Sequence, residues 1–134
     1  MLRFNGDSPL FDPQPIKDLK VAAKSDQFDL LTTVSLRPYP SGMNVEMINA
    51  QTFLENYPKF IKPEHREHVT KYFYENADEF RIYRQACPVN FKAAKFSLDT
   101  QEDFDRLLMI FAQMSRPHYQ YTLEEKCELL SLVP

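Results

Sequence analysis

The sequence is poor in glycine. Gly6 and Gly42 are the only two glycines among 134 residues, against ten prolines. Loops that cradle phosphate groups need several glycines, because their backbone must approach the anion closely and adopt conformations that other residues resist. The sequence contains neither a Walker loop nor a G-x-G-x-x-G motif. If this chain acts on a nucleotide, the usual phosphate-binding loop is not among these residues.

Cysteines, long apolar runs and an excess of basic residues are absent or scarce as well. Cys87 and Cys127 lie far apart and without neighbouring histidines, which gives little support to a zinc site or a redox pair and fits a reduced, cytoplasmic setting. The opening residues lack a signal-peptide pattern, and no apolar run approaches the ~18 residues of a membrane-spanning helix. The net charge is -3, so we expect neither nucleic-acid nor membrane partners.

What the sequence does contain is the composition of an ordinary soluble protein. Apolar residues make up 43% and charged residues 26% of the chain. A chain of 134 residues is long enough to bury a hydrophobic core and falls within the usual size of one domain. We therefore expect a single domain that spans residues 1–134.

Apolar spacing alternates along the chain between the period of strands and the period of helices. Strands are expected at 1–6, 29–34, 44–48, 80–86 and 94–99, and helices at 13–24, 50–57, 63–77, 100–116 and from 122 onward. The sequences TQED and TLEE form capping boxes at the start of the last two helices. The spacing of four apolar residues predicts the face that packs the first of these helices on a sheet: Phe104, Leu107, Leu108 and Phe111. Strands alternating with helices predict an α/β layer structure.

Five segments, taken in order, carry a resemblance to a known family. They are FNGDSPLFDPQPI, YPSGMNVEMI, REHVTKYFYENADEFRI, FSLDTQEDFDRLLMIF and YTLEEKCELL. Together they resemble the spore-coat polysaccharide biosynthesis protein F family, one of the sugar-nucleotide cytidylyltransferases, from about residue 3 to the C-terminus. The resemblance implies a Rossmann-like nucleotide-diphospho-sugar transferase fold, with a mixed sheet and flanking helices.

The resemblance also implies an activity and an incomplete site. Complete members join CTP to a sugar and release pyrophosphate, and they begin with a strand and a glycine-rich loop that holds the triphosphate. This sequence matches the family downstream of that loop, so we expect a partial fold that lacks the N-terminal nucleotide-binding part. Such a chain should be inactive alone, unless a second polypeptide or sequence upstream supplies the absent part. Whether it is an enzyme therefore stays open, and the alternative is a non-catalytic dimerisation or interaction module derived from the same fold.

The expected truncation has a structural consequence. A parallel sheet that lacks its first strands exposes an unpaired edge beside the opening strand, and such an edge tends to pair with another chain. Pairing of two copies would restore the backbone hydrogen bonds of that edge. We therefore expect a homodimer formed through the exposed sheet edge.

Two aspartates match acidic positions of the family. Asp7, in GDSPL, corresponds to an aspartate that helps to hold the divalent metal on the nucleotide phosphates, and Asp99, in SLDTQEDF, corresponds to a second acidic position. Both are expected at strand ends, where open α/β sheets bind ligands, and Mg²⁺ suits one or two carboxylates plus phosphate oxygens. The alternatives are that Asp7 is a turn residue and that Asp99 only caps the following helix.

Two further residues match the family's sugar-binding side. Glu46, in NVEMI, is a candidate hydroxyl-binding group, with an exposed strand residue as the alternative. Asn44 stands where the family carries an acidic residue, which puts direct acceptor recognition there in doubt. His68, in EHVT, is a candidate for bonding the sugar, or a helix-face histidine that bonds its neighbours. The spacing of His65 and His68 does not fit the H-E-x-x-H metal motif, so no metal is expected there.

Overall fold

A mixed four-stranded sheet lies at the centre of the protein. The computed structural model describes residues 1–25, 27–35, 38–88, 91 and 94–133. The strands are β1 (Leu2–Arg3), β2 (Leu30–Thr32), β3 (Glu46–Ile48) and β4 (Ile82–Arg84), in the order β1-β3-β2-β4. β3 pairs antiparallel with both β1 and β2, whereas β4 runs parallel to β2. The predicted mixed sheet is therefore confirmed.

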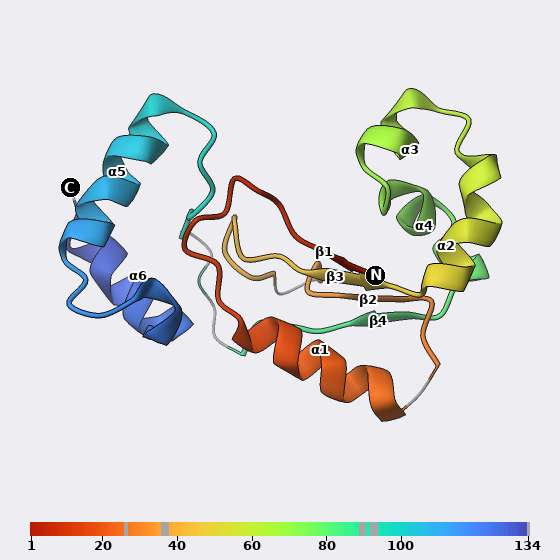
Figure 1. The fold of residues 1–134 in the computed structure, drawn as a ribbon, viewed down its shortest axis with the longest axis horizontal. Helices are drawn as coiled ribbons and strands as arrows, with labels where there is room; N and C mark the ends of the chain where they lie inside the picture. The colour runs from red at the N-terminus through yellow and green to blue at the C-terminus, as the bar shows by residue number, and fades with distance from the viewer. Residues whose placement is uncertain (26, 36–37, 89–90, 92–93, 134) are drawn as a thin grey trace.

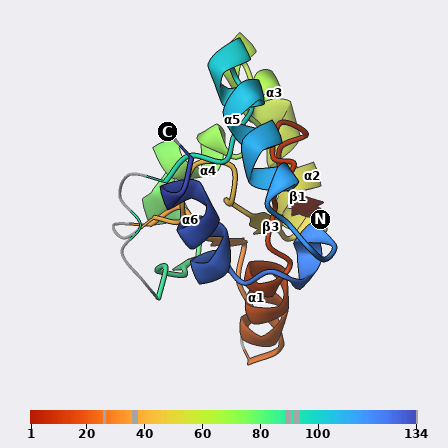
Figure 2. The same ribbon diagram turned by 90° about the vertical axis from the view of Figure 1, so that its left-hand side faces the viewer.

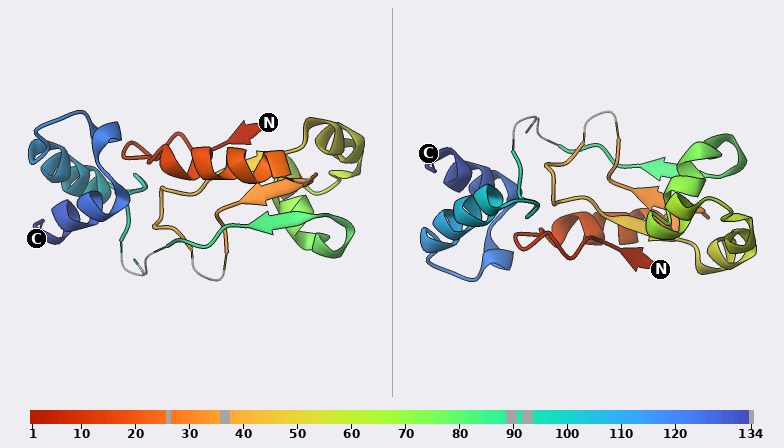
Figure 3. Two further views of the ribbon diagram at one scale, coloured as in Figure 1. Left: turned by 90° about the horizontal axis from the view of Figure 1, so that it is seen from below. Right: turned by 90° about the horizontal axis from the view of Figure 1, so that it is seen from above.

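The helices form three groups around this sheet. They are α1 (Gln14–Ser25), α2 (Ala50–Asn56), α3 (Pro63–Glu67), α4 (Lys71–Glu75), α5 (Gln101–Ala112) and α6 (Leu123–Ser131), with short 3₁₀ turns at Tyr57–Lys59, Ala77–Glu79 and His118–Gln120. α1 runs along one face of the sheet, and α2, α3 and α4 gather at one end of the other face (Figure 1). α5 and α6 pack together at the opposite end, as Figures 2 and 3 also show.

Each group of helices has its own apolar cluster. Leu19 of α1 packs with Leu31 and Val45 on one face of the sheet. Leu30 and Ile48 point to the other face, where they meet aromatic residues of the α2 to α4 group, including Phe60, Tyr72 and Phe73. The alternation of Leu30 and Leu31 between the two faces follows from the period of two in a strand. The sheet is thus covered on both faces at this end.

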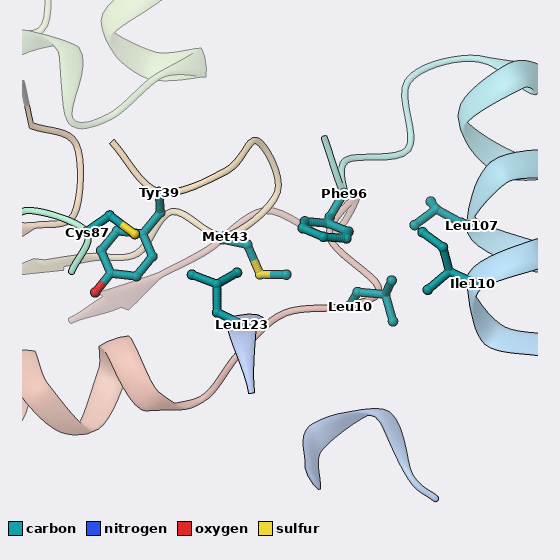
Figure 4. Packing of buried hydrophobic residues seen from close by; sticks show 8 residues of the cluster. All are labelled: Leu10, Tyr39, Met43, Cys87, Phe96, Leu107, Ile110 and Leu123. Atoms are coloured by element: carbon teal, nitrogen blue, oxygen red, sulfur yellow. The ribbon is translucent and has the colours of Figure 1, made fainter. Parts of the chain in front are cut away.

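The third cluster joins α5 and α6 to the loops beside the sheet. Leu107 and Ile110 of α5 point toward Phe96 and Leu10, which lie on loops (Figure 4). The remaining members are Tyr39, Met43, Cys87 and Leu123. Because most of these residues lie on loops rather than on strands, this cluster fixes the loops that carry the candidate site.

Helix starts agree with the capping signals in the sequence. The carboxylate of Asp12 accepts a hydrogen bond of 2.9 Å from the backbone N–H of Gln14 at the start of α1. Thr100 and Thr122 begin α5 and α6, and both capping boxes are complete. Side-chain caps of this kind stabilise a helix by about 1 kcal/mol each.

Two predicted elements are wrong in extent. The helix expected at 63–77 is broken, because His68 has φ −115° and ψ 77°, outside helical values, and separates α3 from α4. The strand expected at 94–99 is reduced to one parallel bridge between Lys95 and Ser41. Burial does not alternate along this segment as it would in a strand with one covered face, because Phe96 and Ser97 are both buried and Leu98 is exposed.

The buried face of α5 also differs from the predicted face. Leu107 is buried, but Phe104, Leu108 and Phe111 are 44%, 51% and 37% exposed. The helix packs on α6 and on loops, and the cluster it joins contains no strand residue. The buried stripe is Asp103, Leu107 and Ile110, which leaves the predicted apolar stripe only partly covered.

Candidate functional site

Three loops meet to form a polar hollow of about 190 Å³ beside the sheet. They are the loop after β1, the loop before β3 and the segment before α5, coloured red, yellow and cyan in Figure 1. The hollow is lined by Asn5, Asp7, Ser8, Ser41, Gly42, Asn44, Ser97 and Asp99. The structure therefore brings the two predicted aspartates, which are far apart in the sequence, to the lining of one hollow.

Backbone hydrogen bonds hold the three loops against one another. The N–H of Leu98 donates to the carbonyl oxygen of Asp7 at 2.8 Å, and the N–H of Phe96 donates to the carbonyl oxygen of Ser41 at 2.8 Å. The segment before α5 is thus tied to both of the other loops. Asp7 itself lies in a turn, so its turn geometry and its place in the hollow are compatible.

Gly42 lets these loops approach closely. Its φ is +86°, in the region that side chains other than glycine rarely adopt. A Cβ atom at this position would lie 2.6 Å from the backbone nitrogen of Ser97 and 2.7 Å from the carbonyl carbon of Phe96. One of only two glycines in the chain is therefore required by the wall of the hollow.

Hydroxyl groups and one lysine orient the two carboxylates. Ser8 donates from Oγ to Asp7 Oδ1 at 3.0 Å. Asp99 Oδ2 accepts from Ser97 Oγ at 2.9 Å and forms an ion pair of 2.9 Å with Lys95 Nζ. Lys95, and then Ser97, lower the pKa of Asp99. Asp99 is therefore ionised at neutral pH.

Asp99 does not cap α5. The N-cap is Thr100, and the carboxylate that completes the capping box belongs to Asp103. Asp103 also accepts from the backbone N–H of Asp99 at 3.1 Å. The side chain of Asp99 is thereby left with Ser97 and Lys95 as its partners, and the predicted alternative of a purely capping role is not supported.

The donor set of the hollow suits a hard cation. Two carboxylates, three serine hydroxyls and the side-chain amides of Asn5 and Asn44 supply oxygen atoms. Mg²⁺ and Ca²⁺ prefer oxygen ligands, and Mg²⁺ is usually held by one or two carboxylates together with water and phosphate oxygens. The residues present therefore fit the Mg²⁺ that the sequence resemblance implies.

Glu46 lies outside this hollow, in a polar row that crosses the sheet. The register aligns Arg3, Glu46, Thr32 and Arg84 on the four strands. Glu46 is only 5% exposed, so the alternative of an exposed strand residue is wrong.

All the partners of the Glu46 carboxylate are side chains. Oε2 accepts from Arg3 and from Thr70 Oγ1, the latter at 3.1 Å, and Oε1 accepts from the hydroxyl of Tyr74. Burial, followed by the charge of Glu46, raises the pKa of Tyr74. This pair therefore keeps Tyr74 protonated and donating to Glu46.

His68 and His65 have opposite environments. The ring of His68 is exposed, and its Nε2 lies 3.9 Å from Glu67 Oε1. His65 is buried, and its Nε2 lies 3.0 Å from Glu75 Oε2. Lys62, and then His65, lower the pKa of Glu75 to about 2.

One cluster near these histidines has metal-like spacing. Ligand atoms of Glu64, His65 and Glu75 lie within 4.8 Å of one another. The two carboxylates already pair with lysines, because Lys71 lies 3.0 Å from Glu64 and Lys62 lies 2.9 Å from Glu75. Both carboxylates of this cluster are thus paired with a lysine, and the cluster is a network of ion pairs. In the hollow only Asp99 has such a partner, and no ion pair of Asp7 is found among the described residues.

Two larger hollows lie elsewhere on the protein. One of about 290 Å³ is lined by the starts of α1 and α6, and another of about 550 Å³ lies beside β1, β3 and α2. The aspartates that line them have structural partners: Asp12 caps α1, Asp18 accepts from Gln14 and Gln85, and Asp29 accepts from Thr52 and from the backbone of Arg81. Neither of these hollows contains Asp7 or Asp99.

The sequence alone did not identify Lys95, Ser41 and Ser97 as parts of the site. Lys95 lies four residues before Asp99, and such a pair of opposite charges is a readable signal in a helix but not in a loop. The serines have no distinguishing pattern, because Ser41 meets Ser97 (2.9 Å between the Oγ atoms) only through the tertiary fold.

The mixed sheet and the arrangement of its helices define an α/β protein whose fold is similar to that of a solved cytidylyltransferase. Over 98% of its length the chain superimposes on a cytidylyltransferase from Leptospira borgpetersenii serovar Hardjo-bovis (strain JB197), with a TM-score of 0.83 and 24% identity. It is also 26% identical, over 114 residues, to the spore coat polysaccharide biosynthesis protein SpsF of Bacillus subtilis (strain 168). Both likenesses confirm the resemblance inferred from the sequence motifs.

These likenesses cover only part of each relative. The chain spans 46% of SpsF and 55% of the Leptospira protein, about half the length of either. No protein-family model matches the chain. Within the described residues, none of the helices has the length and apolar character needed to cross a bilayer.

Proposed function

We propose that this chain forms the metal-binding part of a cytidylyltransferase site for sugar precursors of polysaccharides, with Asp7 and Asp99 as ligands of Mg²⁺. The observation that carries the proposal is the convergence of these two carboxylates, from distant segments, on one hollow rich in oxygen donors. The likeness to SpsF and to the Leptospira cytidylyltransferase supports the choice of reaction class.

In this reaction a sugar hydroxyl would attack the α-phosphate of CTP, and pyrophosphate would leave. A bound Mg²⁺ would supply Lewis-acid stabilisation of the phosphate charge. The chain's own contribution is to hold Asp7 through Ser8 and Asp99 through Ser97 and Lys95, so that both carboxylates are oriented before a ligand arrives.

Glu46 and His68 remain the proposed contacts to the sugar. The Glu46 carboxylate is shared by Arg3, Thr70 and Tyr74. A sugar hydroxyl would therefore reach Glu46 only by replacing one of these donors. Thr70 lies two residues after His68, so an approaching sugar could meet the exposed histidine and the Glu46 network together.

We further propose that the chain alone is catalytically silent. Removal of a single hydrogen-bond donor that is already oriented toward the charge of the transition state lowers the rate by about 10²–10³. A chain without a glycine-rich triphosphate loop would lack several such donors. Pyrophosphate release from CTP and a sugar should then be undetectable with this chain alone.

An interaction module is the second candidate, because two surfaces are uncovered. β1 pairs on one side only, with β3, and Met1, Leu2 and Phe4 around it are exposed. The apolar stripe on α5 is exposed as well. A homodimer formed through the β1 edge would cover the first surface. Sedimentation of the chain at micromolar concentrations distinguishes a stable dimer from a monomer.

The metal site is tested by titration with Mn²⁺, a spectroscopic substitute for Mg²⁺. Electron paramagnetic resonance of free Mn²⁺ should show one site, which Asp7→Asn or Asp99→Asn weakens at least tenfold. Asp78→Asn is the matched control, because Asp78 is an exposed aspartate of a short turn near α4, outside the lining of the hollow. Equal binding by all four proteins would refute the assignment.

A further inference from the structure

Lys95 is held rigidly beside the candidate metal site. Its Nζ lies 2.5 Å from Asp103 Oδ2 and 2.9 Å from Asp99 Oδ2. Asp103 is buried, and its carboxylate also accepts from the backbone N–H groups of Asp99 and Thr100 at 3.1 Å each and from Arg106. Because Asp103 is fixed by these bonds, it anchors the ammonium of Lys95.

The anchored ammonium determines how Asp99 presents its carboxylate. Oδ2 of Asp99 accepts from both Ser97 and Lys95. Within the described part of the chain, no hydrogen bond to the other oxygen, Oδ1, is found. Oδ1 is therefore the oxygen available to a ligand in the hollow.

Lys95 also changes the charge that an incoming cation meets. Asp7 and Asp99 together carry two negative charges, and the ammonium cancels one of them at a distance of 2.9 Å from Asp99. A divalent ion in the hollow is consequently attracted by both carboxylates and repelled by the neighbouring ammonium, so the attraction is weaker than two carboxylates alone would give. Salt screens the interaction between exposed charges only beyond a Debye length of about 10 Å, so both the attraction and the repulsion act on a cation in the hollow.

We propose that Lys95 is a positioning residue that orients Asp99 and competes with the divalent cation for its carboxylate. The inference rests on the metal site proposed above and adds the control of its affinity. Lys95 keeps the site organised when no cation is bound, at the expense of affinity for a free cation. It touches neither substrate nor reacting atoms in this role.

The test is Mn²⁺ titration of Lys95→Gln and Lys95→Arg against the unmodified protein. Loss of the charge should tighten binding of free Mn²⁺ roughly 1.5- to fivefold, as expected for a partly exposed ion pair. Lys95→Arg keeps the charge and should bind as the unmodified protein does. Lys20→Gln is the matched control, since Lys20 is exposed on α1 and does not line the hollow.

The tighter Mn²⁺ binding of Lys95→Gln must depend on the carboxylate of Asp99. Adding Asp99→Asn to Lys95→Gln should abolish the tighter binding. Arg106 and two backbone N–H groups still pair with Asp103 in the Lys95 variants, so they should fold, and circular dichroism checks this. Lys95→Met provides a second neutral variant if Lys95→Gln does not fold.

The outcomes separate this inference from the proposed function. Binding by the unmodified protein that is unchanged or weaker in Lys95→Gln would overturn the competition and leave the metal site intact. Tighter binding in Lys95→Arg as well would show that charge is not the cause, which also overturns it. Absence of binding in the unmodified protein and in both neutral variants would refute the metal site and the inference with it.

Discussion

Substitution of Gly42 by alanine should damage the candidate site and the stability of the protein together. At φ +86° an alanine costs roughly 1–2 kcal/mol relative to glycine. Its Cβ would also lie 2.6 Å from Ser97 N, 2.7 Å from Phe96 C and 2.9 Å from Phe96 O. All three are backbone atoms, so they cannot turn away as a flexible side chain could.

Relief of this overlap requires a shift of the segment before α5. That shift would strain the 2.8 Å bonds from Phe96 N to Ser41 O and from Leu98 N to Asp7 O. Overpacking of this kind typically costs about 1–3 kcal/mol. With the backbone cost added, the free energy of unfolding should fall by roughly 2–5 kcal/mol.

Urea unfolding monitored by circular dichroism measures this change, and Gly6→Ala is the matched control. A Cβ at Gly6 meets nothing within 4 Å, and among the described residues only Gly42 combines glycine with a positive φ. Gly6→Ala should therefore change the free energy of unfolding by less than about 1 kcal/mol. Equal stability of the two variants would show that the wall of the hollow does not require glycine at position 42.

Three other predictions concern stability. Burial lowers the pKa of Lys126 from its ordinary 10.5, and its Nζ has no hydrogen-bond partner. The folded state thus binds the ammonium proton of Lys126 more weakly than the unfolded chain does, so Lys126→Met should raise the free energy of unfolding by about 1 kcal/mol or more at pH 7. Urea titrations at higher pH should show that this gain shrinks toward pH 10.5, where the lysine of the unfolded chain also loses its proton. Leu107→Ala should cost about 2–4 kcal/mol and Leu108→Ala less than about 1, because only the first is buried; similar losses would contradict the assigned face of α5. Tyr74→Phe leaves Glu46 with one donor fewer in a buried site and should cost about 1–3 kcal/mol in thermal unfolding; no loss would show that the bond is not formed.

The sequence was sufficient to predict the fold where local and tertiary preferences agree. The capping boxes at Thr100 and Thr122 identify helix starts by chemistry that depends on four residues or fewer. Each of the four sheet strands lies inside a predicted range, although β1 and β4 are shorter than predicted and are not fully buried. The apolar run of β2 is buried throughout. The break at His68 has no such local signal, since no glycine or proline marks it. The apolar residues with helical spacing, Val69, Tyr72 and Phe73, all follow the break.

The failure at α5 has a physical reason as well. Phe104, Leu107, Leu108 and Phe111 satisfy the spacing of a core stripe. The helix instead turns Leu107 and Ile110 inward, and Asp103 lies on the same buried side because Lys95 and Arg106 neutralise it. Arg106 lies on the same helix, but Lys95 comes from the segment before it, and a partner from another segment cannot be predicted from the periodicity of the helix.

For the candidate site, the sequence resemblance identified the aspartates but not their setting. The convergence of Asp7 with Asp99 depends on backbone bonds between loops, and the orienting groups Ser41 and Ser97 lie more than fifty residues apart in the sequence. Residue types that recur everywhere on protein surfaces, such as serine and lysine, acquire a role only through this geometry. Their participation therefore required the structure.

Because three separate loops line the hollow, a bound cation should also stabilise the fold. A ligand that binds only the folded state adds about 2.7 kcal/mol to the free energy of unfolding at a concentration of 100 times its Kd. Mg²⁺ at saturating concentration should therefore raise the urea midpoint of the unmodified protein. At one low Mg²⁺ concentration, the midpoint of Lys95→Gln should rise more than that of the unmodified protein. Asp7→Asn should show no such gain, because it removes the carboxylate that has no competing ammonium. A gain of equal size in Asp7→Asn would show that Mg²⁺ acts on the protein through some other surface.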